Sequence, residues 1–305
     1  MRILRRLALG ATLLALVVGA CSPGGGGKPT VKVGSVGFDE ARVMAEIYAQ
    51  VLEANGYSVD RSGIGLGARP VVAPAIESGQ IDLQPEYIGS RLAHEGGSPT
   101  GDSAANHAAL QEALEAKNLT VLDYTPAIDT NAFVVRRQTA EEFSLSTLGD
   151  AAAVQDQLRW GLAQDCPTNA LCGLPGGALE QYGITQATIA GATLLAACDT
   201  PMADALRNET IDVAELCSTQ PDILVNGWVI LEDTLRTQPA DNVAPVVRDD
   251  LLDRVDRDAF TGILNDVSAA IDTPTLAELY KRVAVDHEDA DDVAGDWLRE
   301  KGFIE

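Results

Sequence analysis

Strand and helix patterns alternate along this chain, and the alternation limits the folds it can adopt. Residues 30–35 alternate apolar and polar side chains, residues 39–55 carry an apolar stripe at helical spacing, and residues 57–59 resemble a short strand. Parallel neighbouring strands need a crossover, usually a helix, so this unit predicts a parallel sheet. The order strand, helix, strand, helix, strand occurs twice, and a helical pattern runs from residue 249 to the end. The sequence therefore predicts an α/β protein with two lobes.

The boundaries between the lobes are expected at two apolar strand patterns, residues 132–136 and 224–230. We expect the chain to leave the first lobe, build the second and then return. Residues 30–132 and 226–305 then form lobe 1, and residues 133–225 form lobe 2. A chain of 305 residues is long enough for two modest lobes.

Residues 77–90 form the stretch around which a binding site is expected. Gly79 is placed to end a helix, because glycine enters the left-handed cap without strain. A short apolar strand follows over residues 81–83, and Pro85 is expected to end its hydrogen bonding. In an open α/β sheet, ligands bind beyond the carboxyl ends of the strands. Tyr87 is therefore expected beside a ligand.

A strong negative charge narrows the classes of ligand. The formal net charge is -23, and residues 1–20, with three arginines and no acid, leave -26 for the rest of the chain. A generic nucleic-acid binder is excluded, because phosphate contacts need a basic surface. The charge favours cationic or zwitterionic ligands over anionic ones, although a need for solubility explains it equally well.

The N-terminus has the pattern of an export signal. Residues 1–20 contain a positive start, an apolar run from residue 7 to residue 18 and a small-residue end, and the run is shorter than a membrane-spanning helix needs. Cys21 follows directly, as in a bacterial lipobox, where the cysteine is lipidated. Residues 21–29 then read as a flexible, glycine-rich tether. We expect an exported protein anchored at the outer face of the cytoplasmic membrane.

The remaining cysteines are even in number, which favours disulfides in an exported protein. Cys166 and Cys172 flank a short loop and are expected to pair locally. Cys198 and Cys217 each end an apolar strand pattern and could pair across neighbouring strands. A zinc site is the alternative, although the spacing is not that of a zinc finger.

No catalytic signature is present in the sequence. It lacks a nucleophile elbow, a phosphate-binding loop, a dinucleotide fingerprint and a calcium loop. Its three histidines, His94, His107 and His287, lie in polar settings. We therefore expect a protein that is not an enzyme and that uses no cofactor and no metal.

A family resemblance spans nearly all of residues 30–305. The segments that carry it follow in order: GSVGFDEARVMAEIYAQVLEANGYSV, AIESGQIDLQPEYIG, DCPTNALCGLPGGALEQYGI, ALRNETIDVAELCSTQPDI, WVILEDT, NVAPVVRDDLLD, LNDVSAAI and DDVAGDWLREKGFI. Together they resemble the substrate-binding proteins of glycine betaine/choline/proline-type ABC importers. The resemblance implies a two-lobed type II periplasmic-binding-protein fold, each lobe a sheet flanked by helices, with the ligand in the cleft between them.

The same resemblance implies where a ligand binds. In this family an aromatic cage surrounds a quaternary ammonium, a cation–π arrangement. Tyr87, in PEYIG, matches a cage tyrosine. The full predicted set of ligand-binding residues is Phe38, Tyr87, Ser90, Asn131, Thr168, Asn169 and Asp241.

Several of these positions depart from the family pattern. Ser90 stands where a threonine is usual, and Asn131 and Asp241 stand where cage tyrosines are common. Asn169 replaces an arginine and Val36 a lysine, both of which grip a carboxylate. Each lost cation–π face removes roughly 0.5–2 kcal/mol. The pocket is therefore expected either to bind betaine weakly or to be refitted for another polar or aromatic ligand.

The sequence thus predicts a lipid-anchored, monomeric binding protein. It would deliver an osmoprotectant-like solute to an ABC permease and its ATPase, without binding nucleic acid. Closure is expected by hinge motion around residues 132–135 and 225–228. A solute sensor or interaction module with the same fold is the alternative from another functional class.

Overall fold

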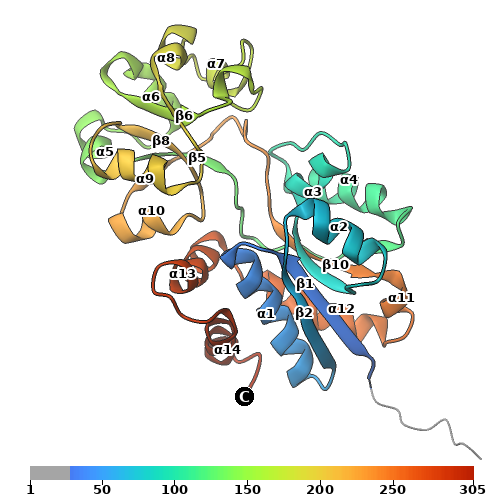
Figure 1. The fold of residues 1–305 in the computed structure, drawn as a ribbon. Helices are drawn as coiled ribbons and strands as arrows, with labels where there is room; N and C mark the ends of the chain where they lie inside the picture. Colours follow the sequence, from blue (N-terminus) through green and yellow to red (C-terminus); the bar gives the residue numbers. More distant parts are fainter. Residues whose placement is uncertain (1–27) are drawn as a thin grey trace, which may run out of the picture.

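The computed structural model describes residues 28–305, in which two mixed sheets lie in separate lobes (Figure 1). The predicted signal peptide (1–20), Cys21 and most of the predicted tether lie outside the described residues. The sheet of lobe 1 has the strand order β2 (Ser58–Gly67), β1 (Thr30–Val36), β3 (Leu83–Tyr87), β10 (Val243–Arg248), β4 (Leu119–Val121). The sheet of lobe 2 has the order β7 (Thr193–Leu195), β6 (Trp160–Ala163), β8 (Val213–Cys217), β5 (Asn131–Val135), β9 (Val229–Leu231).

Both sheets combine parallel and antiparallel pairs. Strand β1 runs parallel to β2 and β3, and β6 runs parallel to β7 and β8, as expected for strands joined by helices. The antiparallel strands are those that follow the long connections: β10 pairs with β3 and β4, and β5 pairs with β8 and β9. The predicted α/β class with two lobes is confirmed.

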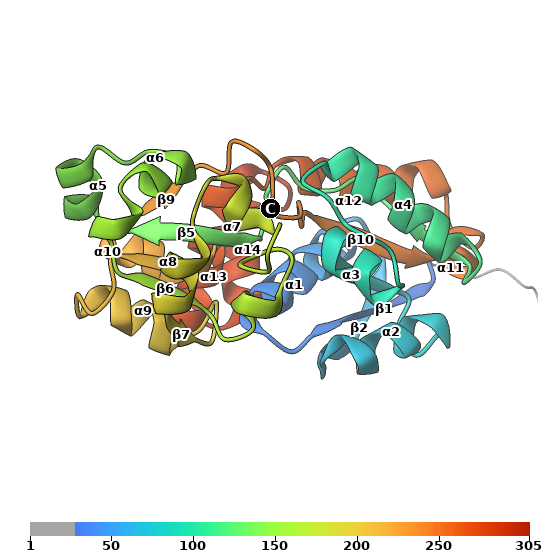
Figure 2. The same ribbon diagram turned by 90° about the horizontal axis from the view of Figure 1, so that it is seen from above.

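Helices cover both sheets, and Figure 2 shows the two groups side by side from above. The helices of lobe 1 are α1 (Asp39–Ala54), α2 (Arg69–Glu77), α3 (Ile88–His94), α4 (Ser103–Glu115), α11 (Asp249–Leu252), α12 (Arg257–Ala269), α13 (Thr273–Ala284) and α14 (Ala290–Lys301). Those of lobe 2 are α5 (Arg137–Phe143), α6 (Leu148–Ala153), α7 (Ala178–Gln181), α8 (Gln186–Gly191), α9 (Thr200–Arg207) and α10 (Pro221–Asn226), with single 3-10 turns at Gln155–Gln157 and Cys166–Thr168. Among residues 28–305, no helix combines the length and the apolar composition that a bilayer crossing needs.

Each lobe has its own hydrophobic core. In lobe 1, helices α1, α12 and α14 bury apolar side chains against β1, β3 and β10. In lobe 2, alternate residues of β5 face opposite sides of the sheet, because successive strand side chains point in opposite directions. Phe133 packs with the core beneath α6 and α8, whereas Val134 packs with the core beneath α9.

Two connecting segments, residues 122–130 and 232–242, join the lobes. They are hydrogen-bonded to each other: the Asp129 amide donates to the Asp241 carbonyl at 3.0 Å, and the Thr130 hydroxyl donates to the Pro239 carbonyl at 2.7 Å. Helix α10 of lobe 2 also contacts α13 of lobe 1 (Figure 1). The two lobes are thus joined by a pair of backbone segments that are bonded to each other.

The predicted crossing points differ from these segments. Residues 132–135 lie inside β5, and β9, which we expected in lobe 1, pairs with β5 in the sheet of lobe 2. The run 224–230, expected to be one strand, is divided between α10 and β9. Pro221 starts α10 and Gly227, with φ of 60°, ends it. The residues expected to form the hinge therefore lie in or directly after elements of lobe 2, and the position of the hinge and the exact limits of the lobes stay predictions.

Pro85 does not end β3, which continues to Tyr87. Pro85 lies opposite Pro245 in the antiparallel pair of β3 and β10. The Pro245 carbonyl accepts from Leu122 on the β4 side, at 2.8 Å, so the facing prolines form a non-hydrogen-bonded pair. No hydrogen bond between β3 and β10 is lost there. Gly79 is confirmed as a helix stop, because it follows α2 with φ of 79°.

Candidate functional site

A cavity of about 360 Å³ lies between the lobes, and we call it the interlobe cavity. An adjoining cavity of about 260 Å³ shares Ser90, Asp129, Cys217 and Asp241 with it. The residues that line the interlobe cavity come from both lobes and from the connecting segments: Phe38, Glu40, Arg69, Tyr87, Ser90, Asp129, Cys198, Cys217, Thr219, Gln220, Asp241 and Tyr280.

Aromatic side chains form one wall of the interlobe cavity. Tyr87 ends β3 and Phe38 immediately precedes α1, and their ring centroids lie 5.5 Å apart. Tyr87 is 3% exposed, whereas Phe38 is 45% exposed. Tyr280 of α13 lines the same cavity. Aromatic rings near a ligand can contribute cation–π contacts, and the predicted cage stays a prediction.

A hydrogen-bonded group of acidic residues lies behind this wall. The Tyr87 hydroxyl donates to Glu40 Oε1 at 2.5 Å. The Thr219 hydroxyl faces both Glu40 and Asp129 but donates to Asp129 Oδ1, at 2.8 Å. Glu40 is 1% exposed, and within residues 28–305 its Oε2 has no hydrogen-bond partner. The site thus holds a buried carboxylate oxygen that lacks a donor.

Burial raises the pKa of every carboxyl group in the interlobe cavity. Desolvation, followed by the nearby charge of Asp129, raises the pKa of Glu40 to about 8. Desolvation is also the main cause that raises the pKa of Asp129 to about 6, and it raises the pKa of Asp241. Arg69 is the one cationic side chain among the described lining residues, and its Nε already donates to Glu86 at 3.2 Å. The site is strongly acidic.

Asp241 holds the start of α3. Its Oδ1 accepts from the amides of Gly89 and Ser90, at 2.7 and 3.0 Å, and its Oδ2 accepts from the Ser90 hydroxyl. Orphan amides at a helix start are commonly satisfied in this way. A Cβ on Gly89 would lie 2.9 Å from the Ala240 carbonyl oxygen, so only glycine permits this close approach. Asp241 therefore caps α3, and its role toward a ligand stays a prediction.

The structure brings together some of the predicted site residues. Phe38, Tyr87, Ser90 and Asp241 line the interlobe cavity, and Asn131 lines the adjoining one. Thr168 and Asn169 line neither of these two cavities. Both lie in the disulfide-closed loop, where Asn169 Nδ2 donates to Asp165 at 3.0 Å. Leu171 of the same loop does line the adjoining cavity.

Sequence reasoning missed Glu40, Arg69, Asp129 and Tyr280. Glu40 left a signal, because it lies three residues before Val43 on the apolar stripe of α1. A carboxylate on a core-facing stripe is a candidate for function. The other three left none, since acidic residues are common in this chain and Arg69 and Tyr280 lie in ordinary helices.

Both expected disulfides are present in the structure. Cys166 pairs with Cys172, and Cys198 pairs with Cys217 at a Cα–Cα distance of 4.8 Å. The second disulfide lines the interlobe cavity. It does not join neighbouring strands, because β6 lies between β7 and β8. It links the loop after β7 to the end of β8.

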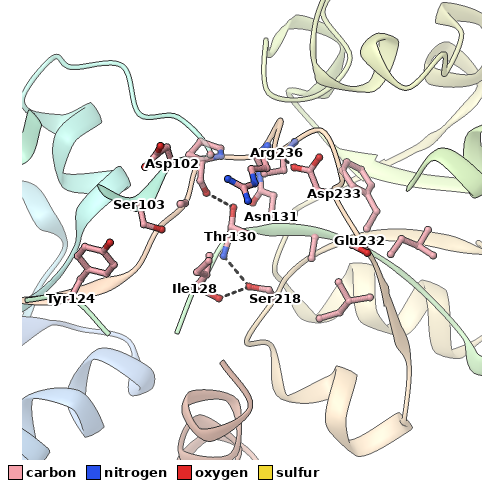
Figure 3. A pocket seen from close by; sticks show the side chains of 18 of the residues that line it. Asp102, Ser103, Tyr124, Ile128, Thr130, Asn131, Ser218, Glu232, Asp233 and Arg236 are labelled. Carbon is pink, nitrogen blue, oxygen red and sulfur yellow. Dashed lines mark hydrogen bonds between the residues drawn. The ribbon is translucent and has the colours of Figure 1, made fainter. Parts of the chain in front are cut away.

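A larger cavity, of about 530 Å³, borders the same connecting segments (Figure 3). Figure 3 shows Ser218 between the backbone groups of Thr130 and Ile128: its hydroxyl accepts from the Thr130 amide at 3.0 Å and donates to the Ile128 carbonyl at 2.9 Å. These bonds tie the end of β8 to the connection. The charged side chains of Glu232 and Arg236 here are exposed. The larger space thus lacks the buried acidic group of the interlobe cavity.

Comparisons with known proteins agree with this architecture. Residues 29–300 match the family model described as the substrate binding domain of ABC-type glycine betaine transport systems. The glycine betaine-binding protein YehZ of Escherichia coli is 29% identical over 283 residues, which cover 90% of this chain and 91% of that protein. A glycine-betaine-binding protein of Pseudomonas aeruginosa is 27% identical over 290 residues, covering 90% and 89%.

Solved structures share the fold. Ligand-free YehZ from Escherichia coli superimposes with a TM-score of 0.77 at 29% identity, covering 90% of this chain and 99% of that one. A structure titled glycine betaine/carnitine/choline ABC transporter gives a TM-score of 0.79 at 20% identity, covering 90% and 100%. The two-lobed periplasmic-binding-protein architecture and the family match over residues 29–300 lead to one conclusion. The chain belongs to the family of substrate-binding domains of ABC-type glycine betaine transport systems.

Proposed function

We propose that this protein is a lipid-anchored receptor that captures an osmoprotectant-like small solute and delivers it to an ABC permease. The observation that carries the proposal is the interlobe cavity, because both lobes and both connecting segments contribute to its wall. Its aromatic residues Phe38 and Tyr87 suit an ammonium group. Family membership supports a role in solute transport rather than in catalysis.

Closure of the lobes is the expected response to the solute. The connecting segments 122–130 and 232–242 are two short lengths of backbone outside the named helices and strands. Segments of this kind are suited to hinge motion. Rotation of lobe 2 toward lobe 1 would move the loop that carries Thr168 and Asn169 toward Ser90, because Leu171 of this loop already shares the adjoining cavity with Ser90. These two predicted ligand residues would then contact the solute only in the closed form.

The location follows from the N-terminal sequence and from the family. Membership in a family of periplasmic-type binding proteins implies export. Residues 1–20 would be removed and Cys21 lipidated, which would hold a monomer at the outer face of the cytoplasmic membrane beside its permease and ATPase. Cys21→Ala should release the protein from the membrane fraction, while a protein that stays bound would contradict the anchor.

A refitted pocket is a second possibility for the ligand class, and the buried acidic residues favour it. Glu40 and Asp129 line the cavity that would have to accommodate a betaine carboxylate. Like charges in a buried site repel strongly. The transport function is unchanged in this case, but the solute differs from betaine.

Calorimetry combined with small-angle X-ray scattering tests the proposal. The protein is titrated with glycine betaine, choline, carnitine, proline and N,N-dimethylethanolamine. We expect at least one to bind and to reduce the radius of gyration, as the lobes close. A folded protein that binds none of them and keeps its radius of gyration would contradict the receptor function.

A further inference from the structure

Within the proposed receptor function, on which this inference rests, we propose a specific class of solute. The interlobe cavity selects a small protonated amine that carries no carboxylate, and Glu40 Oε2 accepts a hydrogen bond from its N–H group. Aromatic faces alone would accept a trimethylammonium group equally well. The acidic wall adds a requirement that such a group cannot meet.

The charges that line the cavity disfavour a solute carboxylate. Glu40, Asp129 and Asp241 face the space from α1 and from both connecting segments, and Arg69 is the one cation among the described lining residues. Arg69 already donates to Glu86, which is 1% exposed. A zwitterion would place its anionic end among three acids, where the one cationic side chain of the described lining is Arg69, already paired with Glu86 through its Nε. A simple cation avoids this repulsion.

The three acidic residues differ in how many hydrogen bonds their carboxylate oxygens already accept within the protein. Asp241 accepts three bonds from the start of α3, and Asp129 accepts from Thr219. Glu40 accepts from Tyr87 through Oε1, but its Oε2 has no donor within residues 28–305. When a bound cation displaces the proton that Glu40 holds in the solute-free protein, Oε2 becomes a buried acceptor, so a solute that supplies the donor gains affinity. Glu40 is therefore the acid that remains to be satisfied.

Only one kind of small cation supplies that donor. A quaternary ammonium has no N–H and can offer the Glu40 oxygen charge but no hydrogen bond. A protonated primary, secondary or tertiary amine offers both, and charge-assisted bonds are about twice as strong as neutral ones. Its methyl or methylene groups can lie against Phe38 and Tyr87, whose rings are adjacent. The aromatic wall and the acidic wall then bind different parts of one solute.

Four probes of similar size separate the two requirements. Glycine betaine has a carboxylate and no N–H, N,N-dimethylglycine has both, choline has neither, and N,N-dimethylethanolamine has an N–H and no carboxylate. We expect calorimetry at pH 7 to show the highest affinity for N,N-dimethylethanolamine, about tenfold or more above the affinity for choline. Glycine betaine and N,N-dimethylglycine, which carry a carboxylate, should bind more weakly than choline. Choline binding as well as N,N-dimethylethanolamine would overturn the hydrogen-bond assignment. Glycine betaine binding most tightly would overturn the inference and leave the receptor function intact.

Variants locate the effect at Glu40. Glu40→Gln should reduce the preference for N,N-dimethylethanolamine over choline to about threefold or less, because the charged acceptor is gone. Asp39→Asn is the matched control, because it removes a carboxylate one residue away that does not line the cavity. This variant should keep the wild-type ratio of the affinities for N,N-dimethylethanolamine and choline. An unchanged ratio in Glu40→Gln would contradict the assignment. No binding of any probe to a folded wild-type protein would contradict the receptor function as well.

A measurement on the wild-type protein covers the case in which Glu40→Gln does not fold. Burial and nearby acids keep Glu40 largely protonated near pH 7, so binding of a cation should release a proton. The heat of N,N-dimethylethanolamine binding should then differ between buffers with different ionisation enthalpies, and equal heats would contradict the role of Glu40. The charged or titratable groups that face Glu40 across the cavity are Arg69, Tyr87, Asp129, Asp241 and Tyr280.

Discussion

The hydroxyl of Tyr87 donates a 2.5 Å hydrogen bond to Glu40, so the ring expected to contact the solute also positions a buried carboxylate. Tyr87 ends β3, and Glu40 lies in the first turn of α1. Two neighbouring elements of lobe 1 thus present an aromatic face and an acid to the same cavity. Substitution of either residue should therefore alter the hydrogen bonding and the position of the other side chain.

Tyr87→Phe should lower the free energy of unfolding by about 1–3 kcal/mol, because it leaves Glu40 with no donor at either oxygen. Solute affinity should also change, since Glu40 loses its orientation. Tyr48→Phe is the matched control: it removes another buried phenol hydroxyl of lobe 1, one that pairs with Ser268 at 2.9 Å away from the cavity. Urea unfolding and calorimetry of both variants check this. Equal effects on binding would argue against the Tyr87 assignment.

The stability of the solute-free protein should depend on pH through Glu40. Its pKa is raised from 4.5 to about 8 in the folded state, so between these values the folded chain holds a proton that the unfolded chain releases. The free energy of unfolding therefore falls as pH rises from about 5 to about 8, by at most about 1.4 kcal/mol per pH unit for this group. Glu40→Gln should flatten the curve. Parallel curves for the two proteins would show that Glu40 does not titrate there.

Asp241→Ala should destabilise lobe 1 by about 0.5–2 kcal/mol, because the α3 amides of Gly89 and Ser90 lose their acceptor. Asp241→Asn keeps a carbonyl oxygen for these amides and should retain more of the stability. Thermal unfolding of the two variants measures the difference. If Asp241→Asn is destabilised as strongly as Asp241→Ala, charge rather than helix capping accounts for the role of Asp241.

The disulfides should stabilise the protein unequally. The Cys198–Cys217 bond spans 19 residues and the Cys166–Cys172 bond spans 6. Loop-closure entropy then predicts losses of about 3 and about 2 kcal/mol when each pair is replaced by alanine. The Cys198–Cys217 pair also lines the interlobe cavity, so its removal should weaken solute binding more than removal of the Cys166–Cys172 pair does. A larger loss of affinity in the variant that lacks only the Cys166–Cys172 bond would contradict this placement.

The sequence predicts the fold where local chemistry and tertiary packing agree. The apolar stripe of residues 39–55 becomes α1, and Gly79 ends α2 with a positive φ. Pro85 was misread because a proline is compatible with a strand when its missing amide is not part of the ladder. That condition depends on register, and register is set by β10, more than 150 residues away in the chain.

The candidate site was predictable only in part, for a related reason. Tyr87 and Ser90 lie in a recognisable motif, and both line the interlobe cavity. Asp129 and Tyr280 join them from segments far apart in the chain, and neither has a local pattern that marks it. The role of Asp241 depends on its distance in space from Gly89 and Ser90 at the start of α3, which are 152 and 151 residues away in the sequence. The spacing of residues along the sequence does not reveal such contacts between distant segments.

A crystal structure with N,N-dimethylethanolamine, or with whichever probe binds most tightly, tests the central claim most directly. The account predicts one solute between the closed lobes, with its ammonium beside the Tyr87 ring and within hydrogen-bond distance of Glu40. Density for the solute in the larger cavity beside Tyr124 and Arg236 (Figure 3), or on the outer surface of either lobe, would contradict it.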